Sequence, residues 1–533
     1  MKGKEKAKTN FNAKIEMKMK MKSKKHAATN SIKSNRGITL VALVVTIVVL
    51  IILATISINA VLGENGLIKK AQQAQEVHEQ GTQKEQNDLD KYAEYLDKEL
   101  NNGNYQDKYL DNTLPVSPRL AEGMTKVKYN STSGKWERVT DVSAEWYNYA
   151  SNKREWANVV LGDATFNSDG TLDETRPYTQ LVWIPRFAYQ ITTLYHTGSE
   201  DSAGNVNVVF IDENNQNKDK TTTYTTTYPS ATEATGMSGY VVHPAFDYDG
   251  KHLTGFWMGK FESSHRGCTK DVATGQATFT GKEVMTVKAN VTSWRNITIG
   301  DAFTTCLSMN KIGNPYGLHS SDNAVDPHMV KNDEWGAVAY LSKSIYGKNT
   351  EEVFINNSST YITGNAGATA DASSASGITN AYSTANGMKA STTGTIYGIY
   401  DMSGGNWERV AAYVNNGHGN LATNGSSLVN AASKYKNVYT ATNTGGNDSQ
   451  SGNYDLSTPA NGHYGDAVYE TSGTYTGQGS WYKDYSDFPV AEWPFFYRGG
   501  GCSNTSDAGV FFFGGDTGGA YADSGFRVVV PVL

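Results

Sequence analysis

Three cysteines, Cys268, Cys306 and Cys502, are the side chains best suited to metal binding, redox chemistry or nucleophilic attack. They are widely spaced, and none forms the Cys-x-x-Cys pattern that holds zinc or an iron–sulfur cluster. A disulfide between Cys268 and Cys306 is compatible with the sequence, and one cysteine is left over in any pairing. The cysteines therefore predict neither a metal site nor a cofactor.

The histidines form no catalytic or metal-binding pattern either. Four of the ten, His265, His328, His418 and His463, are scattered over predicted loops, where each is expected at the surface. No Ser-His-Asp set and no carboxylate pair stands out among the polar residues. We therefore predict that the chain is not an enzyme and has no catalytic residue.

The last stretch, residues 497–533, combines strand and loop signals. An Arg-Gly-Gly entry at 498–500 precedes a segment rich in Gly, Ser, Asp and aromatic residues, with a short predicted strand at 509–513. The β-branched residues at 526–530 predict a closing strand. Because loops held by rigid strands often carry binding residues, this stretch is the candidate functional region.

Composition sets the broad class. The chain has 533 residues, more than one domain usually contains, and a net charge of −6 without a basic bias. A nucleic-acid partner is therefore not expected. Tyrosine is abundant, with 32 residues, and Tyr, Ser, Gly and Asn are common on adaptable binding surfaces. The same composition is also ordinary in loop-rich secreted β proteins.

A lysine-rich leader, residues 1–37, precedes a long apolar segment, residues 38–63. No charged residue occurs between Arg36 and Glu64, so the segment is long enough to cross the ~30 Å hydrocarbon core of a bilayer as a helix. The lysines place the leader in the cytoplasm by the positive-inside rule. The sequence therefore predicts a single-pass cell-membrane protein with its C-terminal domain outside the cell.

The junction at Arg36-Gly37-Ile38 and the apolar residues after it resemble the signal of type IV prepilins. The resemblance implies cleavage after Gly37 by a prepilin peptidase and N-methylation of Ile38. The family usually has a glutamate at the fifth mature position, where this chain has Ala42. That departure argues against a major pilin subunit, and it leaves open a minor pilus-associated protein or a simply anchored one.

The middle of the chain alternates between short strands and polar segments. Residues 64–103 have apolar residues at helical spacing and predict a stalk, and residues 104–174 predict a small β-rich region or linker. Residues 355–386 and 415–479 are rich in small polar residues and predict exposed loops. The predicted strands of this part are residues 127–129, 135–139, 145–149, 156–160, 181–191 and 255–262.

Two further local signals have a direct structural meaning. Pro185 interrupts the strand at 181–191 and indicates an edge strand or a bulge. Helical spacing predicts helices over 299–309 and 333–345, with Thr298 and Asn332 as their N-caps.

Five motifs, in order, resemble the formylglycine-generating-enzyme (sulfatase-modifying-factor) type of the C-type-lectin fold over residues 175–533. The resemblance implies an α+β domain with two helices around a small twisted antiparallel sheet and long irregular loops, after the N-terminal transmembrane and stalk helix. It also implies a core position for Trp407 and a buried structural carboxylate at Glu408. The motifs are residues 256–262, 291–294, 333–339 and 398–408, and Arg498-Gly499-Gly500 with Gly525-Phe526-Arg527.

The resembled enzymes bind copper through two cysteines that lie five residues apart after the Arg-Gly-Gly motif. Soft thiolate ligands suit Cu(I), and a single thiol does not supply the pair. This chain has only Cys502 there, and Asp507 stands at the fifth position after it. A formylglycine-type oxidase is therefore the disfavoured alternative, and a pilin-like structural subunit is another.

The order of motifs at the C-terminus also resembles the variable proteins of diversity-generating retroelements. In that family a reverse transcriptase alters codons copied from template adenines, and a lectin-fold frame displays the altered residues to ligands. The fixed frame here is Arg498, Gly499, Gly500, Ala508, Gly509, Val510, Phe511, Gly525, Phe526 and Arg527. The implied variable, ligand-binding positions are Gly501, Cys502, Asn504, Asp507, Phe512, Gly514, Asp516, Thr517, Tyr521 and Asp523.

Together these features predict a surface-displayed, membrane-anchored adhesin or receptor. Its C-terminal loops, residues 498–527, would bind a ligand on another cell, a phage or a host surface, without a cofactor. Phe512 has a special place in this prediction, because alternation along the strand turns it outward when Phe511 and Phe513 face the core. An exposed phenylalanine there would act as a binding anchor.

Overall fold

The computed structural model describes Pro115 and eight longer segments, all within the unit that begins at Tyr109. The predicted membrane helix (38–63), the stalk (64–103) and the processing residues Gly37 and Ile38 lie outside the described residues. The segments are 117–140, 145–194, 203–232, 235–266, 284–318, 325–377, 379–440 and 463–533.

Two predictions are corrected by the helices that the structure does describe. No helix in the described segments is long and apolar enough to cross a bilayer. The longest of them, α5 (Asn332–Lys343), has 12 residues. On this finding we withdraw the predicted transmembrane helix and the single-pass membrane location with an extracellular domain; residues 38–63 themselves lie outside the described segments.

The predicted fold class, α+β with a long N-terminal helix, is also wrong, because the described residues form mainly strands. Strands β1 to β23 predominate, whereas the described α-helices, α4 to α7, are short. The physical reason lies in the apolar residues, which occur mainly in short β-branched and aromatic runs that suit strands. Within the described segments, the two stretches predicted as helices from their spacing are brief, and they form α4 and α5.

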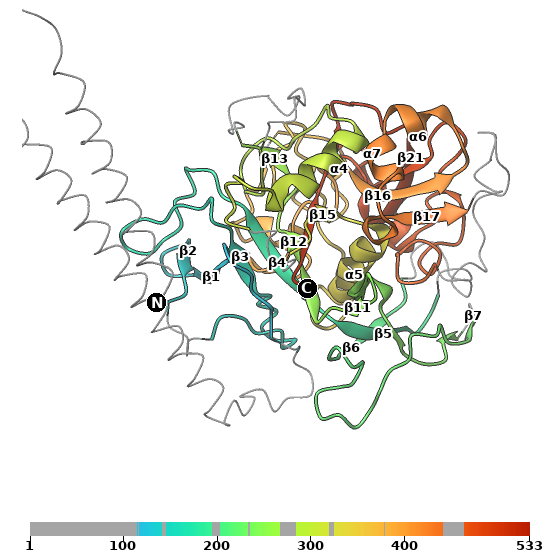
Figure 1. Cartoon of the computed structure of the whole chain (residues 1–533), viewed down its shortest axis with the longest axis horizontal. Coiled ribbons are helices and arrows are strands. Elements are labelled where there is room, and N and C mark those ends of the chain that lie inside the picture. Colours follow the sequence, from blue (N-terminus) through green and yellow to red (C-terminus); the bar gives the residue numbers. More distant parts are fainter. Residues whose placement is uncertain are drawn as a thin grey trace, which may run out of the picture. The chain divides into compact units, whose positions relative to one another are not determined.

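The first seven-stranded sheet has the order β15-β23-β12-β4-β3-β1-β2, and its neighbours pair antiparallel. Trp257 lies opposite Trp183 in the register, and their ring centroids are 5.1 Å apart in the core. Strands predicted within residues 104–174 therefore share a sheet with later ones (Figure 1). The strands are β1 (Thr125–Asn130), β2 (Lys135–Arg138), β3 (Asn158–Val160), β4 (Gln180–Pro185), β12 (Gly255–Gly259), β15 (His328–Met329) and β23 (Val528–Pro531).

The second seven-stranded sheet has the order β17-β16-β20-β21-β19-β18, and β22 also pairs with β16. It is mixed, because β16 runs parallel to β17 and β22 and antiparallel to β20. The C-terminal stretch supplies strands to both large sheets. The strands are β16 (Trp407–Asn415), β17 (Asn437–Thr440), β18 (Thr476–Gly477), β19 (Ser486–Asp487), β20 (Phe495–Gly499), β21 (Gly509–Asp516) and β22 (Ser524–Phe526).

Small sheets surround these two. The strand predicted at 181–191 does break at Pro185, into β4 and β5, but β4 lies between β12 and β3 and is not an edge strand. The proline is tolerated because it is the last residue of β4. The small sheets contain β5 (Phe187–Ile191), β6 (Val206–Phe210) and β9 (Val241–Val242); β7 (Ala231–Thr232) and β8 (Gly236–Met237); β10 (Asp247–Tyr248) and β11 (Lys251–His252); and β13 (Ser264–His265) and β14 (Met285–Thr286).

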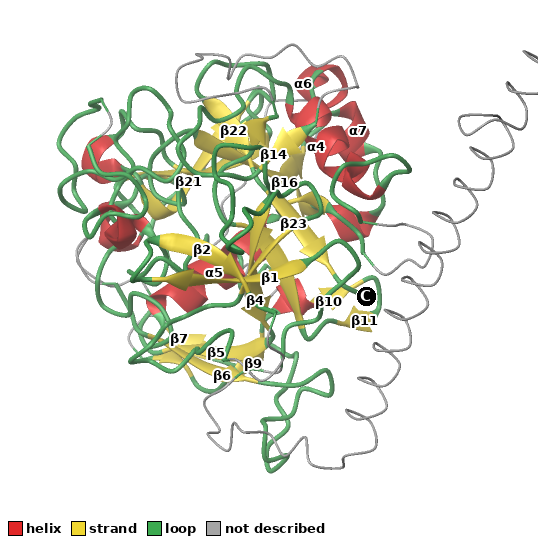
Figure 2. Cartoon of the chain, turned by 90° about the vertical axis from the view of Figure 1, so that its left-hand side faces the viewer, coloured by secondary structure: helices red, strands yellow, loops and turns green. Residues whose placement is uncertain are grey.

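Helix α4 (Ile299–Leu307) begins as predicted, since the Thr298 side chain accepts a hydrogen bond from the Asp301 backbone N–H at 3.1 Å. Helix α5 begins one residue earlier than predicted, with Lys331 as its N-cap, and all of its residues are buried. Figure 2 shows α4 grouped with α6 (Gly419–Thr423) and α7 (Ser426–Val429). The last two formed part of a predicted loop.

The segment at 355–386, which was predicted to be an exposed loop, is irregular but only partly exposed. Its Asn356 side chain donates to the Asp401 carboxylate at 3.0 Å, and Gly364 N–H donates to the same carboxylate at 2.8 Å. The segment therefore supports the turn before β16. The short 3₁₀ turns of the described structure are η2 (Pro244–Phe246), η3 (Ser308–Asn310), η4 (Gly387–Ala390), η5 (Ser433–Tyr435), η7 (Trp481–Lys483) and η8 (Thr505–Asp507).

Candidate ligand-binding groove

Four aromatic rings form a stacked row across the second sheet, which we call the aromatic row. Trp407 on β16 stacks on Tyr497 of β20, with ring centroids 5.4 Å apart and planes 18° apart. Tyr497 stacks on Phe512 of β21 at 6.1 Å, and Phe512 stacks on Tyr485 at 6.5 Å. Cross-strand neighbours of this kind stabilise a sheet and present flat apolar surfaces at its face.

At its Trp407 end, the aromatic row borders an open groove of about 240 Å³. Trp493 and Tyr521 line the groove and are 43% and 45% exposed, which is unusual for such large rings. A groove with exposed aromatic walls and a few polar groups is typical of a ligand-binding site. Its lining residues are Trp407, Trp493, Tyr497, Gly515, Asp516, Thr517, Tyr521, Asp523 and Ser524.

Beneath the sheet, a buried ion pair fixes the strand that carries Trp407. Arg527 Nε donates to Glu408 Oε2 at 2.9 Å, and a second bond joins the same two side chains. Arg527 also donates to the backbone carbonyls of Gly259, at 2.7 Å, and Tyr400, at 2.8 Å. Burial raises the pKa of Glu408, and Arg527 opposes that shift. The prediction of a buried carboxylate at Glu408 is confirmed.

The predicted core position of Trp407 is wrong. Side chains alternate along a strand, so Trp407 and Arg409 face away from the side on which Glu408 is buried. Trp407 is partly exposed, and its indole N–H donates to Asn504 Oδ1 at 2.7 Å. The tryptophan is therefore a wall of the groove.

The Arg-Gly-Gly motif at the end of β20 is part of the frame. Arg498 is fully buried and donates to the carbonyls of Asp466, at 3.0 Å, and Ala467, at 2.9 Å. Burial lowers its pKa to about 10. Gly500 has a φ of +68°, and a Cβ there would lie 2.8 Å from Ala508. Both features explain why these residue types are needed at the turn.

Arg409 stabilises residues at the base of the groove through an ion pair and hydrogen bonds. Its Nε lies 2.6 Å from Asp516 Oδ2, and its remaining nitrogens donate to the carbonyls of Ile297 and Gly519. The Asp516 side chain is only 4% exposed. Asp516 was predicted to be variable and ligand-binding, but in the structure its carboxylate mainly neutralises Arg409.

The loop after β21 forms the outer wall of the groove. Thr517 Oγ1 and Tyr521 Oη lie 2.9 Å apart, and the Thr517 carbonyl accepts from the Asn424 amide at 2.8 Å. The Tyr521 carbonyl accepts from Asn296 N–H at 2.7 Å. Backbone contacts therefore fix this loop, while the Tyr521 ring is left exposed.

The predicted site residues around η8 lie beside the groove and do not line it. Asn504 Oδ1 accepts hydrogen bonds from Trp407 and, at 2.7 Å, from Gly501 N–H. A Cβ at Gly501 would come within 3.3 Å of the Trp407 ring. Asp507 accepts from the Gln478 amide at 2.5 Å. These residues position the edge of Trp407 and the turn after β20.

Two predicted positions on β21 are covered by tyrosine rings from neighbouring segments. Phe512 points to the opposite side from the core residues Phe511 and Phe513, as predicted, but it is only 3% exposed because Tyr497 and Tyr485 cover it. The prediction of an exposed anchor there is wrong. At Gly514 a Cβ would lie 2.4 Å from the Tyr497 ring.

Of the ten predicted binding positions, the structure thus places Asp516, Thr517, Tyr521 and Asp523 in one groove. Sequence reasoning missed lining residues on β16, near the end of β21, at the start of β22 and in the segment around β20. Trp493 carried a signal that could have been used, because it stands in a turn just before a strand. The missed lining residues are Trp407, Trp493, Tyr497, Gly515 and Ser524.

The cysteines are not arranged for shared chemistry in the part of the chain that is described. Cys306 is buried in the core, and Cys502 is 4% exposed beside Tyr361. Burial raises the pKa of both thiols. Cys306 is a free thiol in the structure, and Cys268 lies outside the described residues. No group of three or more His, Cys, Asp or Glu residues among those described could hold a metal ion.

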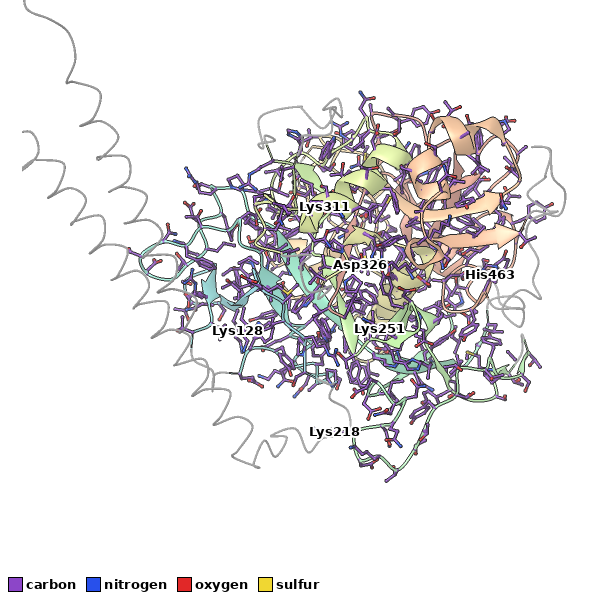
Figure 3. All side chains as sticks on the ribbon, in the orientation of Figure 1. Lys128, Lys218, Lys251, Lys311, Asp326 and His463 are labelled. Carbon is purple, nitrogen blue, oxygen red and sulfur yellow. The ribbon has the colours of Figure 1, made fainter. Side chains whose placement is uncertain are left out.

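The histidines have structural surroundings. His328 is fully buried, against the surface prediction, and its Nε2 lies 2.9 Å from Glu334. His463, labelled in Figure 3, stacks on Tyr439 of β17 with centroids 4.4 Å apart. The remaining two are partly buried: His265 and His418.

The groove is chemically suited to hold a ligand by stacking and by its polar rim. The described residues that line it include no histidine, cysteine or lysine that could act as nucleophile or base. Comparison of the chain with protein-family models and with curated proteins finds no match.

Proposed function

We propose that this chain is a ligand-binding protein that uses the groove, and that a retroelement diversifies the codons of its C-terminal loop. In this proposal the ligand is carried by another cell, a phage or a host. The observation that carries the proposal is the meeting of four positions implied to vary, Asp516, Thr517, Tyr521 and Asp523, in one aromatic-walled groove.

The division between frame and rim supports this function. The frame contains three fully buried charged residues in or next to the second sheet: Glu408 on β16, Arg498 on β20 and Arg527 directly after β22. Trp493 and Tyr521, in contrast, present large rings to solvent above that frame. Binding sites commonly combine a rigid support with a few aromatic anchors, because little conformational entropy is then lost on binding.

The geometry also ranks the implied variable positions. Thr517, Tyr521 and Asp523 can change without disturbing the core, because their side chains lie at least partly in solvent. Gly514 and Asp516 cannot change freely, since one lies against Tyr497 and the other pairs with a buried arginine. We expect diversification to be concentrated at the first three positions.

Deep sequencing of the gene from a population of the source organism tests the proposal. We expect substitutions at Thr517, Tyr521 and Asp523, unchanged codons at Arg498 and Arg527, and a nearby copy of the region that differs at adenines. Uniform codons across residues 495–533, with no adenine-templated copy, would refute diversification. A protein with a fixed specificity would then be the better description of the groove.

A further inference from the structure

One carboxylate of the groove, that of Asp523, has no salt-bridge partner among the described side chains, while the Arg295 guanidinium donates to the carbonyl of the neighbouring Ala522. Asp523 is partly exposed at its rim, and its carboxylate receives only a weak hydrogen bond, from the Ser524 hydroxyl at 3.4 Å. No salt bridge to Asp523 occurs among the described residues, and none of the described lining residues is a lysine or arginine. Asp516, by contrast, is paired with Arg409.

The Tyr497 ring, which lines the groove, lies near the same carboxylate. Burial is the main cause that raises the pKa of the Tyr497 hydroxyl, and the charges of Asp516, Asp487 and Asp523 raise it further. Arg409 acts in the opposite direction. The Asp523 carboxylate is therefore close enough to act on a ring that lines the groove.

The aromatic walls favour the same kind of ligand. The faces of Trp and Tyr rings carry negative electrostatic potential and attract cations within about 6 Å of the ring centre. Trp407, Trp493, Tyr497 and Tyr521 all line the groove. Its volume of about 240 Å³ leaves room for a group of several non-hydrogen atoms.

We propose that the groove binds a cationic nitrogen, an ammonium or guanidinium group, between its aromatic walls and the Asp523 carboxylate. This inference rests on the proposed function, since it names the chemistry of the ligand at the same site. The group belongs either to a lysine or arginine side chain of a peptide or to a small free amine. A neutral ligand such as a sugar could stack on the rings, but it would leave the Asp523 charge without a partner.

Matched pairs of small probes test the charge requirement on the full chain. Choline and its neutral isostere 3,3-dimethylbutan-1-ol have nearly the same shape, and N-acetyl-arginine amide and N-acetyl-lysine amide represent peptide side chains. Saturation-transfer NMR titrations give the affinity for each. We expect choline to bind about tenfold or more tightly than its isostere, and salt to weaken only the charged probe. Tighter binding of the amino-acid amides than of choline indicates a peptide source, and the reverse indicates a free amine.

Three variants assign the effect to named side chains. Asp523→Asn is expected to weaken choline binding about tenfold and to leave the isostere unchanged. Trp493→Ala is expected to weaken both probes. Glu213→Gln, which removes an exposed carboxylate from the loop after β6, is the matched control and should change neither. Circular dichroism confirms that each variant is folded.

Equal affinity for choline and its isostere, or an Asp523→Asn variant that binds choline as the parent does, would overturn the cationic inference. Methyl glucoside binding that is lost in Trp493→Ala would do the same and would favour a neutral ligand in the groove. Absence of binding by every cationic probe would also overturn it. None of these results affects the proposed diversification, which the codon sequencing decides separately.

Discussion

Removal of the Asp516 carboxylate is expected to destabilise the fold, although the residue lies in the stretch implied to vary. The Arg409 side chain is fully buried, and its Nε lies 2.6 Å from Asp516 Oδ2. In Asp516→Ala that guanidinium would lose its counter-charge in a site shielded from water. Loss of one partner of a buried pair costs about 3–5 kcal/mol. Because Arg409 keeps the carbonyls of Ile297 and Gly519 as acceptors, we expect about 3 kcal/mol, the lower end of that range.

Urea-induced unfolding of the full chain, followed by tryptophan fluorescence, measures this loss. Asp523→Ala is the control in the same loop, since its partly exposed carboxylate has no ion pair among the described residues. Its free energy of unfolding should change by no more than about 0.5 kcal/mol. The double variant Arg409→Met with Asp516→Leu replaces both buried charges by apolar groups. It should regain most of the stability that Asp516→Ala loses.

Similar small effects for Asp516→Ala and Asp523→Ala would refute this reasoning. Such a result would mean that water reaches Arg409, so that the ion pair contributes no more than a surface pair does. Asp516 would then be free to vary like the exposed positions of the loop. A large loss in the double variant would instead show that the packing around Arg409 requires the guanidinium itself.

Three further predictions concern other parts of the fold. Gly514→Ala places a Cβ 2.4 Å from the Tyr497 ring and should cost about 1–3 kcal/mol in urea unfolding, whereas Gly419→Ala, which meets open space, should cost nothing. Burial raises the pKa of Glu470 from 4.5 to about 7, so the folded chain holds this proton more tightly than the unfolded chain. Stability should therefore fall as the pH rises between these values, and Glu470→Gln should lessen that fall when unfolding is compared at about pH 5 and about pH 7. The buried Cys502 thiol, whose pKa is raised, should react with a thiol reagent much more slowly in the folded chain than in urea, as mass spectrometry of the labelled peptide can show.

Local features of the sequence predicted local features of the fold. The cap at Thr298 and the break at Pro185 each depend on residues close in the chain, and both are present. The buried position of Glu408, in contrast, was implied by the family resemblance, and its partner Arg527 lies 119 positions away. Side chains alternate between the two faces of a strand, so Trp407, which directly precedes the buried Glu408, should have been placed on the outward face. The core assignment of Trp407 came from the family resemblance, and a period of two along the strand would have corrected it.

Distant contacts account for most of what sequence reasoning could not foresee. Phe512 is turned away from the core as alternation requires, yet Tyr497 and Tyr485 from other segments cover it. Asp516 pairs with Arg409, 107 positions away along the chain. Nothing in the local pattern around either residue distinguishes a covered or paired side chain from an exposed one, since that outcome depends on which strands become neighbours.

The C-terminal stretch supplies β20, β21 and β22 to one large sheet and β23 to the interior of the other, between β15 and β12. During synthesis, the second sheet lacks a strand until Phe526 has emerged from the ribosome, and the first lacks one until Pro531 has emerged. Both sheets of the nascent protein therefore have unpaired strand edges until synthesis is almost finished. Exposed strand edges are prone to aggregation. A frameshift or stop codon between β20 and β23 would remove the fold along with the groove, so only chains read in frame through this stretch would survive to present a binding surface.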